Sequence, residues 1–328
     1  MRDGRMMNFI VLLAALSCGF LGPAHTAAEP THPEPVVIDN CGMTLQVKCP
    51  PRKALAINQN PTEIMLALGL EDHMDGTAYL DDEILPELRE RYEKVPVIAE
   101  KYPSKEVVLG RHTDFIYAGF PGAFTERTVG ERQELLEMGI LTYVTPSLCS
   151  ARRETPMSVD EVLEEITDIG RLFGVEEKAR ELTGAMRAKL VRVQERVGRV
   201  AARKRVFFFD TWGTTEETPF TAGCCGPVGL LIELAGGRNI FSDIVGRMAQ
   251  VNWEVVVERD PEVIVLNDTW WSPAERKKEW LWANPALSRV AAVREGRFVV
   301  VPASATMPGV RFSATVERFA EAFHPEKP

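Results

Sequence analysis

The sequence predicts an α/β protein made of two similar lobes with mainly parallel sheets, joined by one long α-helix. Three observations predict it. Short apolar strands alternate with short helices in each half, which is typical of βαβ units. The order of these elements is the same in the two halves. Between the halves, apolar residues recur every three or four positions over a stretch free of proline, which indicates a continuous helix.

The first 28 residues are expected to be a signal peptide. Arg2 and Arg5 precede the apolar run FIVLLAALSCGFLG, and small residues precede a cleavage point after Ala28, an arrangement typical of export signals. The segment ALSC leaves a second possibility open, in which Cys18 carries a lipid and holds the protein on the membrane. Either route places the protein outside the cytoplasm, as a periplasmic protein or as a membrane-anchored lipoprotein.

Residues 29–156 are predicted to form the N-terminal lobe. After the Pro-rich stretch EPTHPEP, the segment VVIDNCGMTLQVKC predicts a β-hairpin, and RKALAI (Arg52–Ile57) predicts a short strand. A helix follows in PTEIMLALGL, where Pro61 suits the first turn. The later segments DFIYAG and LTYVT are expected to be strands, each preceded by a helix.

Residues 157–202 are predicted to connect the lobes as helices. Ser158 and Glu161 have the spacing of a capping box, which marks the start of the first helix. The second helix is predicted from Val175 to Val200, and it would be roughly 39 Å long at about 1.5 Å per residue. Such a connector is a stiff rod and not a flexible tether.

Residues 203–328 are predicted to form the C-terminal lobe, with the order of the first. KRVFFFD (Lys204–Asp210) corresponds to RKALAI, and PVGLLIELAGGRNIFSD repeats the pattern of an apolar helix, a glycine stop and a polar turn. PEVIVLN and GRFVVVP are expected to be strands, and TVERFAEAFH a closing helix.

The cysteines indicate disulfides and not a metal site. An exported protein meets an oxidising environment, and the sequence has no Cys-x-x-Cys and only scattered histidines, so no zinc or other metal site is expected. In the predicted hairpin Cys41 lies at the turn and Cys49 at a strand end, on the order of 20 Å away. A disulfide between Cys41 and Cys149 is therefore favoured. The adjacent Cys224 and Cys225 form either a vicinal bridge or two buried thiols, and the thiols are favoured.

The charge and the motifs argue against two classes of function. The formal net charge of -9 argues against a nucleic-acid partner, which would need a basic face. The sequence has neither a Gly-x-Ser-x-Gly elbow nor a phosphate-binding loop, and its paired carboxylates stand in polar loops. No catalytic residue is predicted, and the protein is not expected to be an enzyme.

Aromatic residues recur in the segments that follow predicted strands. In open parallel sheets such segments line ligand sites, and two facing lobes would bring these side chains around one cleft. Packing is the alternative for each aromatic alone, but adjacent indoles cannot easily both be buried in one core. Arg311 is a candidate anchor for an anionic group, with a surface ion pair as the alternative. The candidate ligand-binding residues are Tyr79, Tyr102, Phe124, Trp212, Trp270, Trp271 and Arg311.

One short segment occurs twice. KEVVLGRHTDFI (Lys105–Ile116) and WEVVVERDPEVI (Trp253–Ile264) align without gaps. Both predict a helix, a turn and a strand, and this is expected of any two βα units. The shared Glu106 and Glu254 are less easily explained in this way, because many polar residues could open such a helix.

Several stretches together resemble the binding proteins of ABC importers for ferric siderophores, haem and cobalamin. They are RKALAINQNPTEIMLALGL, VPVIAEKYPSKEVVLGRHTDFIYAG, GGRNIF, VNWEVVVERDPEVIVL and NPALSRVAAVREGRFVVVP. The resemblance covers residues from about 36 to 325 and implies two Rossmann-like lobes joined by one long helix. It also implies that Glu106 and Glu254, one on each lobe, dock onto arginines of the permease.

The function expected from this resemblance is capture of an iron chelate, a ferric siderophore, and its delivery to an ABC permease and its ATPase. Haem and cobalamin are the alternative ligands, and bare zinc or manganese ranks lower because histidines are few. No cofactor other than the bound ligand and no nucleic acid is expected, and the protein is expected to be a monomer. An alternative from another class is a metal-cluster enzyme on a similar two-lobed frame, which would need clustered cysteine ligands.

Overall fold

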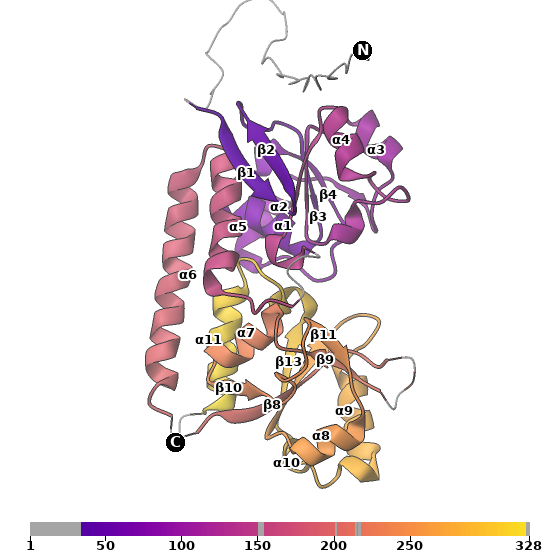
Figure 1. Cartoon of the computed structure of the whole chain (residues 1–328), viewed down its shortest axis with the longest axis vertical. Helices are drawn as coiled ribbons and strands as arrows, with labels where there is room; N and C mark the ends of the chain where they lie inside the picture. The colour runs from indigo at the N-terminus through magenta and orange to yellow at the C-terminus, as the bar shows by residue number, and fades with distance from the viewer. Residues whose placement is uncertain (1–33, 150–153, 201, 214, 216–217, 326–328) are drawn as a thin grey trace, which may run out of the picture.

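A computed structural model describes residues 34–149, 154–200, 202–213, 215 and 218–325 (Figure 1). The predicted signal peptide and Cys18 lie outside these residues. Within the described part of the chain, no helix is both long and apolar enough to cross a bilayer. Two α/β lobes lie one above the other, and two helices run along one side (Figure 1).

The N-terminal lobe is a five-stranded parallel sheet in the order β5-β4-β3-β6-β7. Its central strands β3 and β6 are buried along their whole length, as expected for strands covered on both faces. The strands are β3 (Ala54–Ile57), β4 (Met74–Ala78), β5 (Val97–Ala99), β6 (Phe115–Ala118) and β7 (Leu141–Val144). The helices are α1 (Gln59–Ala67), α2 (Arg89–Tyr92), α3 (Lys105–Gly110) and α4 (Arg132–Glu137).

The predicted hairpin precedes this sheet as β1 (Val36–Asn40) and β2 (Met43–Val47), paired antiparallel. Its turn contains Cys41, which forms a disulfide with Cys149 beyond β7, 108 residues along the chain. This is the pairing that the sequence favours. The hairpin is also held by Asn40, whose side-chain amide donates to the carbonyl of Val144 at 2.7 Å and accepts from the amide of Val144 at 2.8 Å.

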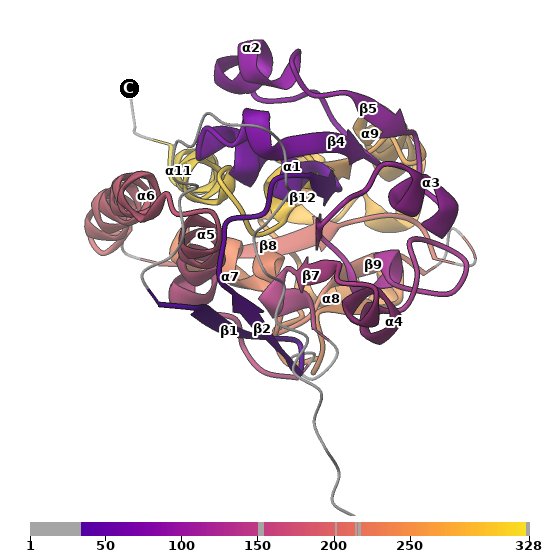
Figure 2. The same cartoon turned by 90° about the horizontal axis from the view of Figure 1, so that it is seen from above.

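Two antiparallel helices connect the lobes: α5 (Val159–Leu172) and α6 (Glu176–Val197). The predicted capping box at the start of α5 is confirmed. The long helix is confirmed as well, although it ends three residues before the predicted Val200. Only one stripe of α6 is buried, because the helix packs on α5, α11 and α7 on one side and is otherwise exposed (Figure 1). Figure 2 shows α5 and α6 on one side of the molecule and α3 and α4 on the other.

The C-terminal lobe is a four-stranded parallel sheet in the order β10-β8-β12-β13, with a small antiparallel pair β9–β11. Along β8, Val206 and Phe208 join one core cluster while Phe207 and Phe209 join another, because successive side chains of a strand point to opposite faces. The strands are β8 (Lys204–Phe209), β9 (Phe220–Ala222), β10 (Gly237–Asn239), β11 (Met248–Gln250), β12 (Val263–Asp268) and β13 (Phe298–Pro302). The helices are α7 (Pro227–Leu234), α8 (Trp253–Arg259), α9 (Ala274–Ala283), α10 (Ala291–Arg294) and α11 (Phe312–Phe323).

The structure corrects the favoured state of one cysteine pair. Cys224 and Cys225 form a vicinal disulfide and are not two buried thiols. The amide of Cys224 donates to the carbonyl of Ile244, and that of Cys225 to the carbonyl of Gly246. These bonds fix the turn before α7 with the two side chains together, and an oxidising environment then favours the bridge.

A buried carboxyl joins α5 to the N-terminal sheet. Glu165 is 1% exposed and accepts hydrogen bonds from the Tyr117 hydroxyl at 2.5 Å and the Thr145 hydroxyl at 2.7 Å. Burial raises the pKa of Glu165 to about 7, although both hydrogen bonds oppose the shift. The folded protein therefore binds this proton more tightly than the unfolded chain does.

This carboxyl predicts a pH-dependent stability. The stabilisation from the bound proton is complete below pH 4.5, the ordinary pKa, and is lost as the pH rises to about 7. In the wild type, the free energy of unfolding should fall by on the order of 3 kcal/mol over this window. Glu165→Gln has no titrating carboxyl at this position, so its free energy of unfolding should not show this fall. Urea unfolding from pH 4.5 to 8 measures it. The exposed neighbour Glu164→Gln is the control, and equal slopes for wild type and Glu165→Gln would refute the prediction.

Candidate functional site

Two residues just beyond strands of the N-terminal lobe have strained backbones. Asn58 follows β3 with φ 77°, and Tyr79 follows β4 with φ 56°. Residues other than glycine rarely adopt positive φ, and such strain concentrates at functional sites. Gly119, beyond β6, lies against Asn58, because a Cβ on this glycine would lie 3.2 Å from the Asn58 Cβ. The carboxyl ends of three adjacent strands thus form one closely packed edge.

Aromatic side chains from both lobes meet around one lysine at this edge. The Tyr79 and Tyr102 rings pack edge to face with centroids 4.7 Å apart. The Lys101 ammonium lies 4.6 Å from the centroid of Tyr79 and 5.1 Å from that of Trp270 in the C-terminal lobe. Trp270 in turn packs edge to face on Trp271. We call Tyr79, Lys101, Tyr102, Trp270 and Trp271 the aromatic rim.

Much of the aromatic rim is open to solvent. Trp270 is 69% exposed and Trp271 is 49% exposed. Burial raises the pKa of the Tyr102 phenol. Burial also raises the pKa of nearby Asp81, and the charge of Asp82 acts in the same direction. The rim therefore offers exposed ring faces beside an ammonium, a surface suited to a flat or anionic group.

Four of the predicted ligand-binding residues therefore come together in the aromatic rim. Sequence reasoning missed the fifth member, Lys101. The available signal was its position beside Tyr102 in EKYPS, between a strand and a helix. The sequence does not show that its ammonium reaches a ring of the other lobe.

The other two predicted aromatics serve mainly in packing. Phe124 is 7% exposed and belongs to the N-terminal core cluster on which Tyr79 and Tyr102 pack. Trp212 is half-buried against Phe209, with ring centroids 5.3 Å apart. The Arg276 guanidinium lies 4.7 Å from the Trp212 centroid. These two side chains present little free ring surface to a ligand, in contrast with the indoles of Trp270 and Trp271.

Arg311, predicted as a candidate anchor for an anionic group with an ion pair as the alternative, forms an ion pair with a buried glutamate. Its Nε donates to Glu63 Oε2 at 2.7 Å and its Nη2 to Glu63 Oε1 at 2.5 Å, a bidentate pair. The Glu63 side chain is fully buried and that of Arg311 is 11% exposed. The pair joins α1 of the first lobe to the N-terminal end of α11, the last helix of the second lobe. It closes the lobes on each other, and we call it the interlobe clasp.

Further hydrogen bonds cross between the lobes. Beside the clasp, the Asn60 amide donates to the carbonyl of Ser304 at 3.1 Å, and the Ser304 amide donates to Asp82 Oδ2 at 2.7 Å. A second contact lies nearer the vicinal disulfide, where Arg247 Nη1 donates to the carbonyl of Ser147 at 3.0 Å. The lobes are thus fastened at two places, and their relative orientation is fixed by directional bonds.

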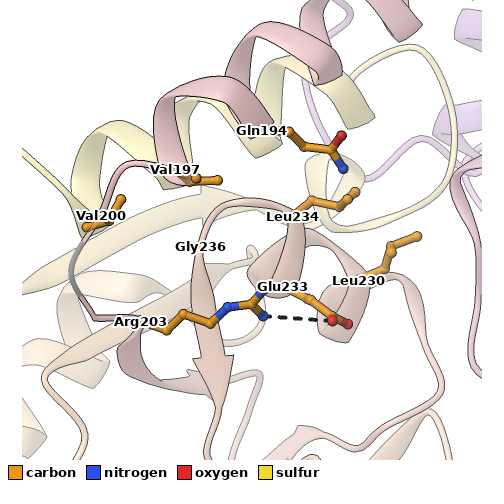
Figure 3. Close-up of a pocket in the computed structure, with 9 residues that line it drawn as sticks. Gln194, Val197, Val200, Arg203, Leu230, Glu233, Leu234 and Gly236 are labelled. Atoms are coloured by element: carbon orange, nitrogen blue, oxygen red, sulfur yellow. Dashed lines mark ion pairs between the residues drawn. The ribbon is translucent and has the colours of Figure 1, made fainter.

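Two cavities lie in other parts of the molecule. One of about 880 Å³ lies in the N-terminal lobe beside Phe124, Pro146 and the Cys41–Cys149 disulfide. The other, of about 610 Å³, lies between the end of α6 and α7, where Arg203 and Glu233 pair across apolar walls of Val197 and Leu234 (Figure 3). Neither is lined by a member of the aromatic rim.

Glu106 and Glu254 occupy equivalent places in the two lobes. Each is exposed and lies at the second position of its helix, α3 or α8. Each helix leads into the strand beside the first strand of its sheet, β6 beside β3 and β12 beside β8. Hydrogen bonds from the Ser104 side chain and from its own amide lower the pKa of Glu106. The repeated sequence is therefore a repeated structural unit with a carboxylate at the same point.

No metal site is found in the part of the chain that the structure describes, because its His, Cys, Asp and Glu side chains form no cluster of three or more suited to a cation.

The sequence of residues 55–305 matches the model of the periplasmic binding protein family. The chain belongs to this family. It is 27% identical to a cobalamin-binding protein of Halobacterium salinarum over 99% of this chain and 86% of that protein. It resembles the crystal structure of a periplasmic binding protein from Veillonella parvula, at TM-score 0.79 and 30% identity, over 90% of this chain and 99% of that one. It also resembles an ABC-type Fe3+-hydroxamate transport protein of Saccharomonospora viridis, at TM-score 0.73 and 25% identity, over 88% and 99%.

Family membership establishes the broad role of the protein. It is an extracytoplasmic substrate-binding protein of an ABC transporter, with a permease and an ATPase as partners, and it is not an enzyme. The two lobes and the long connecting helix of this periplasmic binding protein agree with the architecture expected from its sequence.

Removing one partner of the interlobe clasp is predicted to destabilise the protein much more than removing both charges. Arg311→Met leaves a carboxylate buried without its cation and should lower the free energy of unfolding by about 3–5 kcal/mol. Glu63→Gln combined with Arg311→Met removes both charges and should recover most of that loss. Urea unfolding measures both.

The control for the clasp is the more exposed pair Lys189–Glu317, 3.1 Å apart. Lys189→Met should cost about 1 kcal/mol or less. An equal loss for Arg311→Met and Lys189→Met would show that the clasp stabilises the fold no more than an exposed ion pair does.

Proposed function

We propose that this protein captures an iron chelate, a ferric siderophore, between its two lobes and delivers it to the permease. The observation that carries the proposal is the aromatic rim, in which partly buried tyrosine rings of one lobe and exposed indoles of the other meet beside the Lys101 ammonium. Each stacked ring adds about 0.5–1.5 kcal/mol beyond area burial, so the rim suits a large ligand with flat or anionic groups. The resemblance to the Fe3+-hydroxamate transport protein supports a chelate.

Cobalamin is the second candidate. The relative from Halobacterium salinarum is named a cobalamin-binding protein, and its likeness extends over nearly the whole of this chain. A corrin ring is broad enough to lie against Tyr79 on one lobe and Trp270 on the other. Haem is flat as well and would use the same ring faces. Both ligands would stack on aromatic side chains of the two lobes.

Delivery to the permease would use Glu106 and Glu254. Both carboxylates are exposed and occupy equivalent positions in the two lobes, so a permease with two-fold symmetry could grip each with an arginine. The position at a helix N-terminus also favours a carboxylate through the helix dipole, and this local benefit does not compete with docking.

In this proposal the protein is exported by the leader at residues 1–28, or is anchored through Cys18. It works as a monomer, because the aromatic rim draws on both lobes of one chain. It carries no cofactor of its own and holds its cargo as an intact metal chelate.

Ligand identity can be tested by titrating the protein with ferric hydroxamates, haemin and cyanocobalamin while tryptophan fluorescence is followed. One of them should quench the emission saturably. Trp270→Phe, which leaves a smaller ring, or Lys101→Ala, which removes the cation–π contact, should weaken that binding about 3–10-fold. Trp282→Phe is the matched control, because Trp282 is 57% exposed but packs on Phe298. Equal affinities for the Trp270→Phe and Trp282→Phe variants would exclude the aromatic rim, and no response to the whole panel would contradict the proposed ligand class.

Docking predicts a separation of uptake from binding. The double variant Glu106→Lys and Glu254→Lys should abolish transport in reconstituted vesicles, because like charges would then face the permease. Ligand affinity should stay unchanged. Glu258→Lys, an exposed carboxylate on the same helix as Glu254, controls for charge alone. Transport that survives the double reversal would remove the docking role.

A further inference from the structure

A fully buried lysine lies beneath the segment that carries Trp270 and Trp271. Lys277, in the first half of α9, has 0% of its surface exposed. Leaving an ammonium buried is costly unless its protons are satisfied. Lys277 Nζ donates to the carbonyls of Asn267 and Ser272, the latter at 2.9 Å.

These two carbonyls bracket the tryptophan loop, residues 268–271. The loop is also closed by hydrogen bonds within its own segment, since the Ser272 amide donates to Thr269 Oγ1 at 3.0 Å and the Ala274 amide donates to Asp268 Oδ1 at 2.8 Å. Thr269 and Ser272 are buried, whereas the two indoles between them are exposed. The loop is therefore anchored at its base while its rings face outward.

Two carboxylates, Asp210 and Asp268, favour the charged form of the Lys277 ammonium. Asp210, beyond β8, is partly buried and accepts from the Asn267 amide at 2.6 Å. The Lys277 ammonium lies 5.5 Å from the Phe209 ring centroid. Burial lowers the pKa of Lys277 to about 8, and the charges of Asp210 and Asp268 oppose this shift.

We propose that Lys277 is a positioning residue that holds the tryptophan loop so that Trp270 and Trp271 are presented at the aromatic rim. Because Trp270 contacts Lys101 of the other lobe, the lysine would act on ligand affinity without touching the ligand. The effect of Lys277 on ligand binding rests on the proposed function. The holding itself is a property of the ligand-free protein.

The test uses protein labelled with 5-fluorotryptophan, with fluorine resonances assigned by single Trp→Phe variants. In the wild type, the Trp270 and Trp271 lines should be as broad as that of buried Trp253, although the two indoles are exposed. In Lys277→Met, both lines should shift and narrow while the Trp282 line stays unchanged. Lys278→Met is the matched control, because Lys278 is the next residue along α9 and pairs with Glu275 on the surface.

The outcomes separate this role from ligand identity. Unchanged Trp270 and Trp271 lines in a folded Lys277→Met variant would overturn the proposal. Motionally narrowed lines in the wild type would overturn it even if the variant fails to fold. For whichever of ferric hydroxamate, haemin or cyanocobalamin quenches the wild type, Lys277→Met should weaken binding about tenfold. If none binds, the proposed function fails while the fluorine result still stands.

Discussion

The arrangement of the site depends on the buried pair between Glu63 and Arg311. The carboxylate would be untenable without its partner, because a desolvated charge must be matched by an opposite charge and by hydrogen bonds. Both guanidinium contacts are met with bidentate geometry. Since one partner belongs to each half of the molecule, the pairing of this carboxylate joins the two lobes, together with the hydrogen bonds of Asn60, Ser304 and Arg247. The contact between Lys101 and Trp270 also crosses between the lobes.

Different parts of the protein fix the lobes and contact the ligand in the proposed function. Buried strands, the clasp and the helices α5 and α6 fix the lobes, while the residues beyond the strands remain available for binding. The strained backbones of Asn58 and Tyr79 fit this division, because the surrounding sheet must hold a conformation that the residues themselves disfavour. In the second lobe, buried Lys277 would likewise hold the tryptophan loop whose indoles are exposed.

Much of the fold could be predicted from local patterns. The alternation of apolar strands and helices, the Ser158–Glu161 capping box and the 3–4 spacing of α6 are properties of neighbouring residues, and the structure confirms them. The short strands β9 and β11 were not predicted. Three residues carry too little periodicity to distinguish a strand from a loop.

The site was less predictable because its contacts are long-range. The sequence shows that aromatic residues follow strands, but not that Phe124 turns into the core while Trp270 turns outward. Arg311 is a plausible anion site until its partner is known, and that partner lies 248 residues away. The burial of Lys277 had no signal either, because a lysine in a polar helix segment is usually solvated.

The bridge between Cys41 and Cys149 has a topological consequence. It turns nearly all of the first lobe into a closed covalent ring, with the ends of the ring 108 residues apart in the chain. In the chain-entropy account, closing a ring of this size removes disorder from the unfolded state worth about 4–5 kcal/mol. A single cut by a protease inside the ring would leave both fragments tethered, so nicking alone could not release half of the lobe. This protection exists only after oxidation, and the lobe is therefore most durable in the compartment where it works.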